Sequence, residues 1–202
     1  STEKILKSDN IQTILTDVFS IIAKATKVDR IYYFKNNEVQ KTMSQQKEWV
    51  NTNIEPQIDN LELQNLPHYG NELFMDFISK NKVFSAVVKD IKDAKIRARL
   101  EKQNILTILI FPIFVKNKFY GSIGLDDCTL GRIWSEDEIG ILQILANNIA
   151  TAIERLESGT LLQESEERFK LLANNIPGTV YLSENDKKWS KIYVNDEIEK
   201  LT

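Results

Sequence analysis

The sequence predicts an α+β fold, in which helices cover an antiparallel sheet of about five or six strands. Two long strand-like runs, 105–115 and 118–125, are separated only by Lys116-Asn117. A connection that short is typical of an antiparallel hairpin. Apolar residues also recur at helical spacing near the N-terminus and again after Ser135. We expect these two terminal helices on one face of the sheet and the middle of the chain on the other.

The first elements are a helix over residues 9–26 and two strands. The helix has one apolar face, formed by Ile11, Ile14, Leu15, Val18, Ile22 and Ala25. Ser8 or Asp9 is expected to cap it. The β-branched and aromatic run Arg30–Phe34 predicts a strand. After a turn at Asn36-Asn37, a more polar strand is expected over residues 39–50.

The middle of the chain is less regular. Residues 51–70 contain Pro56, Pro67 and Gly70, and predict irregular structure. A short helix over 71–79 and a strand over 82–88 follow. Asp90 is expected to cap a charged helix over 91–103. The apolar run 105–115 then predicts an inner strand that is buried on both faces.

A long helix is predicted from Ser135 to about Asn175. Ser135 and Glu138 form a capping box, in which each side chain accepts a hydrogen bond from the other residue's backbone amide. Apolar residues follow at heptad spacing, and Ser158-Gly159 shifts the pattern by one residue before Pro177-Gly178 ends it. We expect a homodimer through the terminal helices, with the signalling contacts on this helix at Leu142, Leu145, Ile149, Leu156, Leu162, Phe169 and Leu172. The apolar stripe over 142–156 could instead pack against the sheet of its own domain, but that alternative does not explain the stripe over 162–176.

Composition limits the possible functions. Apolar residues make up 42% of the 202 residues, which is enough for a core. The 26 basic and 29 acidic residues are interspersed, which argues against a nucleic-acid partner. The sequence has no apolar run of the ~20 residues that a membrane span needs. The single cysteine, Cys128, is compatible with a cytoplasmic location.

The last third of the chain resembles the GAF domains of bacterial sensor histidine kinases. The resemblance rests on Gly121-Ser-Ile-Gly-Leu-Asp-Asp127, on Arg132-Ile-Trp-Ser-Glu-Asp-Glu138 and on the helix segments 142–150 and 152–155. Residues 164–170, 175–181 and 189–194 are similar to the start of a PAS domain. The resemblance implies a GAF domain over residues 8–157, a helical linker over 158–176 and an incomplete PAS segment over 177–202.

The sequence shows no catalytic constellation, so we expect that this chain is not an enzyme. It has neither a Gly-rich phosphate loop nor a phosphoacceptor histidine on a helix. His68 is the only histidine, and its loop setting favours a local partner over a role as haem ligand or pH sensor. Cys128 follows two acids that should raise its pKa, which disfavours bilin attachment or oxidant sensing. Asn117-Lys118-Phe119 matches only the start of a cyclic-nucleotide signature.

Acids and aromatics supply the remaining candidate residues. Asp126 and Asp127 could bind a cation, but pairing with Arg132 or with loop amides is the simpler interpretation. Trp134 is expected to pack against the start of the long helix. A GAF pocket would lie between one sheet face and the middle segment, so its small-molecule ligand, which the sequence does not identify, is expected at Trp49, His68, Tyr69, Phe74 and Phe77.

The function implied by the resemblance is a regulatory sensory module of a cytoplasmic signalling protein, with a sensor histidine kinase as the parent. A pocket event or an upstream input would be relayed through the terminal helices. The alternative is a spacer that dimerises without sensing. A polar-rimmed apolar cavity would favour sensing, whereas a filled core would favour the spacer.

Overall fold

The computed structural model describes residues 2–174, 181–183 and 191–194. The chain divides into two compact units, Ser1–Glu154 and Arg155–Thr202. None of the helices in the described ranges combines the length and the apolar composition that a bilayer crossing requires.

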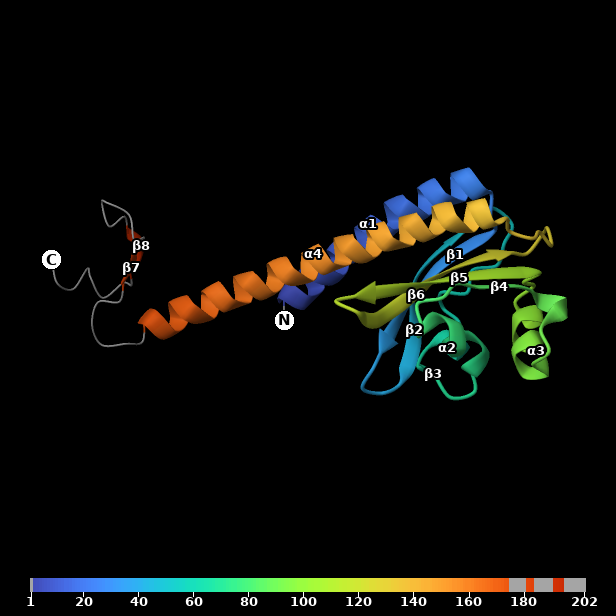
Figure 1. The fold of residues 1–202 in the computed structure, drawn as a ribbon, viewed down its shortest axis with the longest axis horizontal. Helices are drawn as coiled ribbons and strands as arrows, with labels where there is room; N and C mark the ends of the chain where they lie inside the picture. The colour runs from blue at the N-terminus through green and yellow to red at the C-terminus, as the bar shows by residue number, and fades with distance from the viewer. Residues whose placement is uncertain (1, 175–180, 184–190, 195–202) are drawn as a thin grey trace. The chain divides into compact units, whose positions relative to one another are not determined.

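The first unit is built on one antiparallel sheet (Figure 1), whose six strands run in the order β3-β2-β1-β6-β5-β4. β6 lies between β1 and β5, and the two-residue turn between β5 and β6 makes the predicted hairpin. The strands are β1 Arg30–Asn37, β2 Thr42–Val50, β3 Leu66–Pro67, β4 Phe84–Val87, β5 Thr107–Val115 and β6 Lys118–Asp127. The predicted α+β class is therefore confirmed.

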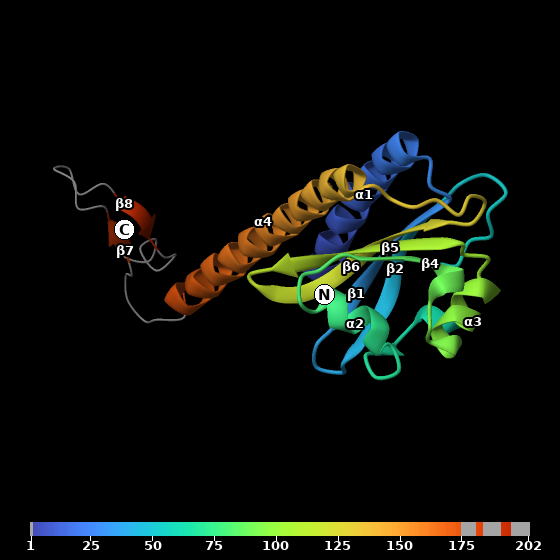
Figure 2. The same cartoon turned by 45° about the vertical axis from the view of Figure 1, so that its right-hand side comes forward.

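Helices cover both faces of the sheet. The two terminal helices lie side by side on one face in both views, and the two shorter helices of the middle segment lie on the other (Figures 1 and 2). The helices are α1 Thr2–Thr26, α2 Glu72–Ile78, α3 Ala94–Lys102 and α4 Glu136–Asn174, with 3-10 turns at Leu61–Leu63 and Val88–Asp90. This is the predicted distribution of helices between the two faces.

Several predicted boundaries are wrong. α1 begins at Thr2, so Ser8 and Asp9 lie inside it rather than at its cap. Asp93, not Asp90, caps α3, because its carboxylate accepts hydrogen bonds from the amides of Lys95 and Ile96. α4 runs without a break from Glu136 to Asn174, including residues 158–159, where the apolar heptad pattern shifts by one residue.

Because side chains alternate along each strand, the sheet has buried apolar side chains on both of its faces. Ile31 and Tyr33 of β1 and Ile123 and Leu125 of β6 face α1 and α4. They form one core with Trp134 and with Ile153 of α4. The opposite face of β5 carries Ile108 and Ile110, which pack with residues of α2 and α3. Because successive side chains of a strand point to opposite faces, each central strand contributes to both layers.

The residues of α4 that were predicted to contact a second copy differ in burial. Leu142 and Ile149 are buried in the core of their own sheet, and Leu145 packs against that core. Leu142 and Ile149 therefore pack against the sheet of their own domain, as the alternative interpretation of this stripe expects, and Leu145 is partly buried beside them. The neighbouring Ile141 and Ile144 are 62% and 60% exposed.

The second unit contains the rest of α4 and a short antiparallel hairpin, β7 Tyr181–Ser183 with β8 Lys191–Val194. Leu156 is half-buried, whereas Phe169 and Leu172 are 45% and 63% exposed. The Phe169 and Tyr193 rings meet edge to face at 5.2 Å. The side chain of Leu162 and most of the predicted PAS segment 177–202 lie outside the described residues.

Candidate functional site

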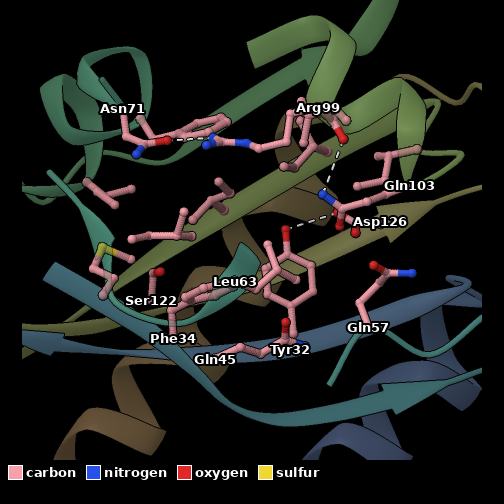
Figure 3. A pocket seen from close by; sticks show the side chains of 18 of the residues that line it. Tyr32, Phe34, Gln45, Gln57, Leu63, Asn71, Arg99, Gln103, Ser122 and Asp126 are labelled. Carbon is pink, nitrogen blue, oxygen red and sulfur yellow. Dashed lines mark hydrogen bonds between the residues drawn. The ribbon is translucent and has the colours of Figure 1, made fainter. Parts of the chain in front are cut away.

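A cavity lies between the sheet and the α2–α3 layer. Its volume is about 90 Å³, counted as the space open to the centres of water molecules. On that measure it has room for several waters or for a small organic molecule. Its apolar wall comes mainly from Phe34, Met43, Leu63, Phe74, Ile78, Leu100, Ile108 and Ile110, and its polar lining from Arg30, Tyr32, Gln45, Glu48, Gln57, His68, Asn71, Arg99, Gln103, Ser122 and Asp126 (Figure 3).

Most of the polar groups reach the cavity because successive side chains of a strand point to opposite faces of the sheet. Arg30, Tyr32 and Phe34 alternate along β1 and line the cavity, as Ser122 and Asp126 do on β6. In β2 the pairing with β1 slips by one residue, since Tyr33 pairs with Lys47 but Phe34 pairs with Gln45. This bulge reverses the alternation, so Glu48 and Gln45 both line the cavity although they are three positions apart.

Asp126 is the most deeply buried acid of the site, with no exposed surface. The Tyr32 hydroxyl donates a hydrogen bond to it at 3.0 Å, and the Arg30 guanidinium lies 3.3 Å from its other oxygen. Gly124 allows this arrangement, because a Cβ there would lie 2.2 Å from the Tyr32 ring. Glu48 also pairs with Arg30, at 3.4 Å.

Burial dominates the ionisation of Asp126. It raises the pKa of this carboxyl to about 7, against the lowering effects of the Arg30 charge and of hydrogen bonds from Tyr32 and Arg30. The negative charge of Glu48 adds a smaller effect that also raises the pKa. The site can therefore take up or release a proton near neutral pH.

The opposite wall carries a different polar pair. Arg99 reaches from α3 and donates to the Asn71 side-chain oxygen at 2.5 Å, while the Asn71 amide donates to the Pro67 carbonyl at 2.8 Å. Apolar side chains separate this pair from Tyr32 and Asp126 (Figure 3). Burial lowers the pKa of Arg99, but a guanidinium stays charged in proteins.

The structure brings only two of the five predicted pocket residues to the cavity. His68 and Phe74 line it, and the Nε2 of His68 lies 2.9 Å from the Asn36 side-chain oxygen. Burial lowers the His68 pKa, so this ring is neutral near pH 7 and donates from Nε2.

The other three predicted pocket residues lie outside the lining. Trp49 packs against the core on the helix side because it follows Glu48, which faces the cavity. Tyr69 is 86% exposed. Phe77 is 40% exposed and packs edge to face on Phe84.

The end of β6 connects the cavity to both terminal helices. Asp127, next to Asp126, forms an ion pair with Arg132, and Arg132 donates to the Thr26 carbonyl at the end of α1 at 2.8 Å. The guanidinium carbon also lies 4.3 Å from the centre of the Trp134 ring. The predicted pairing of Asp127 with Arg132 and the buried position of Trp134 are therefore observed.

Two further contacts fix this junction. The Asp29 carboxylate accepts hydrogen bonds from the amides of Cys128 and Thr129, at 2.9 and 2.8 Å, and from the Thr129 hydroxyl at 2.7 Å. The predicted capping box at the start of α4 is also present. The Ser135 amide donates to Glu138 at 2.8 Å, and the Glu138 amide donates to the Ser135 hydroxyl at 3.2 Å.

Cys128 is half-buried beside this junction. Burial raises the pKa of its thiol to about 11, and the nearby acids add to that effect against the charge of Arg30. The thiol is therefore protonated near neutral pH, as expected from the sequence. Within the part of the chain that the structure describes, no group of three His, Cys, Asp or Glu side chains is placed to hold a metal ion.

Residues 10–153 match the GAF domain family, which is most of the chain. The chain belongs to the GAF domain family. This GAF domain is 40% identical over 154 residues to the methanogenesis regulatory histidine kinase FilI of Methanothrix harundinacea. The aligned part is 75% of this chain but 17% of the kinase. The resemblance to the GAF domain family is therefore confirmed, and the relative is a histidine kinase.

Solved GAF structures share the fold at lower identity. GAF3 of Slr1393 from Synechocystis sp. PCC6803, in its photoproduct state, superposes with a TM-score of 0.66 at 19% identity, over 76% of this chain and 99% of that one. The phycocyanobilin-bound GAF domain of a cyanobacterial phytochrome gives 0.61 at 21% identity, over 78% and 92%. These likenesses establish the GAF fold of the first unit.

Proposed function

We propose that this GAF domain is the ligand-responsive regulatory module of a sensor histidine kinase in the cytoplasm. One observation carries the proposal: the cavity and the junction of the terminal helices share the end of β6. Asp126 lines the cavity, and the adjacent Asp127 holds Arg132, which hydrogen bonds to the end of α1. The 40% identity to a histidine kinase supports the choice of parent.

The relay would act through backbone adjacency. A ligand that changes the hydrogen bonds or the charge of Asp126 displaces the last residues of β6, because neighbouring residues of a strand share one backbone. Asp29 couples to the same segment, since it holds Cys128 and Thr129 and lies next to Arg30 of the cavity. A small shift would then alter how the ends of α1 and α4 pack.

The spacer alternative remains testable. A spacer needs no cavity, and this cavity has both apolar walls and buried polar groups, which supports sensing. Native mass spectrometry of the purified chain, incubated with small-molecule extract of its source cells, should show a retained molecule. Absence of any retained molecule, together with no thermal stabilisation by the extract, would support the spacer.

Amide hydrogen exchange would test whether ligand binding in the cavity changes the junction of the terminal helices. Ligand binding should change amide hydrogen exchange in residues 26–30 and 128–140. Arg132→Gln should keep the binding but reduce this change, because it removes the link between Asp127 and Thr26. Arg155→Gln, an exposed arginine farther along α4, is the matched control. Binding that leaves the exchange of both segments unchanged would refute the relay.

A homodimer through the terminal helices is part of the proposal, with corrected contacts. Ile21 of α1 is 63% exposed, and Ile141 and Ile144 of α4 are similarly exposed. These residues, rather than Leu142 and Ile149, are free to meet a second copy. Light scattering at tens of micromolar should give the mass of a dimer, and Ile144→Lys should lower it without unfolding the chain. A monomeric wild type would refute this part.

A further inference from the structure

No acid among the described residues contacts the Arg99 guanidinium in the cavity, and Asp93 and Glu62 act on its charge only from beyond ion-pair distance. Among the described residues, its guanidinium forms no ion pair and its side chain donates only to the neutral Asn71. Arg30, the other guanidinium of the lining, lies between Glu48 and Asp126. A half-buried guanidinium with free donors favours an anion, and its planar fork matches a carboxylate.

Gln45 supplies an independent sign of a missing partner. Its side chain is 3% exposed and lines the cavity, and neither its amide nitrogen nor its amide oxygen has a hydrogen-bond partner among the described residues. Buried amides are usually satisfied, and an orphaned one beside a cavity indicates that a ligand or water completes it. The β2 bulge is what turns Gln45 toward this space.

The charges and the size of the cavity limit which class of anion it can bind. The other charged groups of the lining, Arg30, Glu48 and Asp126, contact one another, so in the described part of the chain Arg99 is the one cation there that no carboxylate contacts, and a doubly charged phosphate would exceed its single charge. A monoanion neutralises Arg99 alone. The limited volume of the cavity suits a small molecule. The apolar side chains between Arg99 and Tyr32 favour a short hydrocarbon body (Figure 3).

We infer that the cavity binds a small organic monocarboxylate, whose carboxylate is held by Arg99 and whose body lies on the apolar wall within reach of Gln45. This inference rests on the proposed sensory function, because it names the chemical class of the signal. Asn71 acts as a positioning residue: it accepts from Arg99 and is itself fixed by its hydrogen bond to Pro67.

The test compares acids with their neutral amides on the whole chain. Calorimetry would measure binding of valerate, 2-hydroxyisovalerate, valine and benzoate, of the corresponding amides, and of inorganic phosphate. At least one acid should bind more tightly than its amide, which has the same number of non-hydrogen atoms. Arg99→Gln should weaken that acid on the order of tenfold to a hundredfold and leave the amide unchanged.

The matched control is Arg97→Gln, on the same helix but outside the lining, where the guanidinium pairs with Glu101 at 3.9 Å. It should bind as the wild type does. Amides that bind as tightly as acids, tighter binding of phosphate, or no effect of Arg99→Gln would each overturn the inference. The acid–amide comparison needs no variant, so a poorly folding Arg99→Gln chain does not prevent it.

The two proposals can fail separately. If native mass spectrometry finds a retained molecule without a carboxylate, the ligand class is wrong and the sensory function stands. If no extract molecule is retained and none of the acids binds, both fail. If an acid binds but hydrogen exchange at the junction does not change, the ligand class stands and the relay fails.

Discussion

Replacement of Asp126 by asparagine should change how stability depends on pH. The carboxyl group has no exposed surface, and its pKa is raised from 3.8 to about 7, chiefly by burial. In the unfolded chain it titrates near its ordinary value. Between these two pKa values the folded state holds a proton that the unfolded state has lost. The asparagine side chain would keep the same shape but could not titrate.

The sign follows from proton uptake on folding. A raised carboxyl pKa contributes stability that is fully present below the unfolded value and is lost as pH rises through the folded value. One pKa unit corresponds to about 1.4 kcal/mol. For a folded pKa of about 7, the contribution of Asp126 should fall by roughly 2.5 kcal/mol between about pH 5 and about pH 8. The Asp126→Asn chain lacks this loss.

Urea unfolding, followed by tryptophan fluorescence at several pH values, would measure the difference. The free energy of unfolding of the wild type minus that of Asp126→Asn should decrease with rising pH by up to about 1.4 kcal/mol per unit. The subtraction cancels the other titrating groups, which both chains share. Asp59→Asn, a change outside the cavity lining, is the control. Parallel curves for wild type and Asp126→Asn would show that Asp126 titrates normally and refute the argument.

Three other substitutions or reactions test the structure. Asp29→Ala should cost about 1–3 kcal/mol by chemical unfolding, because it leaves the amides of Cys128 and Thr129 without their acceptor; a loss below the error of the measurement would contradict this junction. Leu142→Ala should cost about 2–5 kcal/mol, whereas the exposed Ile144→Ala should change stability little at protein concentrations where the chain is monomeric; equal losses in the monomer would show that the assigned buried face of α4 is wrong. Iodoacetamide should modify Cys128 on the order of a hundredfold more slowly than a free thiol at neutral pH, since its pKa is raised to about 11; a fast reaction would contradict the burial.

The sheet and its helix layers could be predicted because local signals agreed with the tertiary fold. The turn at Lys116-Asn117, the capping box at Ser135 and the apolar stripe of α1 each act within a few residues. The cap of α3 was missed because Asp90 and Asp93 are equivalent as sequence letters. In the structure a 3-10 turn at Val88–Asp90 follows β4 directly, and the helix begins only after its cap at Asp93.

The site was less predictable because it depends on which side of a strand a residue faces. Trp49 was chosen for its aromatic type, whereas alternation from Arg30 and Asp126 would have selected Tyr32 and Glu48. Charged residues at the ends of apolar strands were the available signal. Arg99 could not be distinguished from Arg97 by sequence, since both lie in the same charged helix and only tertiary packing turns one of them inward.

The bulge in β2 has a consequence for comparing GAF domains by alignment. If a relative lacks the extra residue of this bulge, its strand regains regular pairing, and the residues on both sides of the gap keep their partners in β1 and their faces. An alignment that omits this gap would instead shift one half of the strand by one position and assign every side chain of that half to the wrong face. A single gap at this point therefore preserves the groups that two domains present to a ligand.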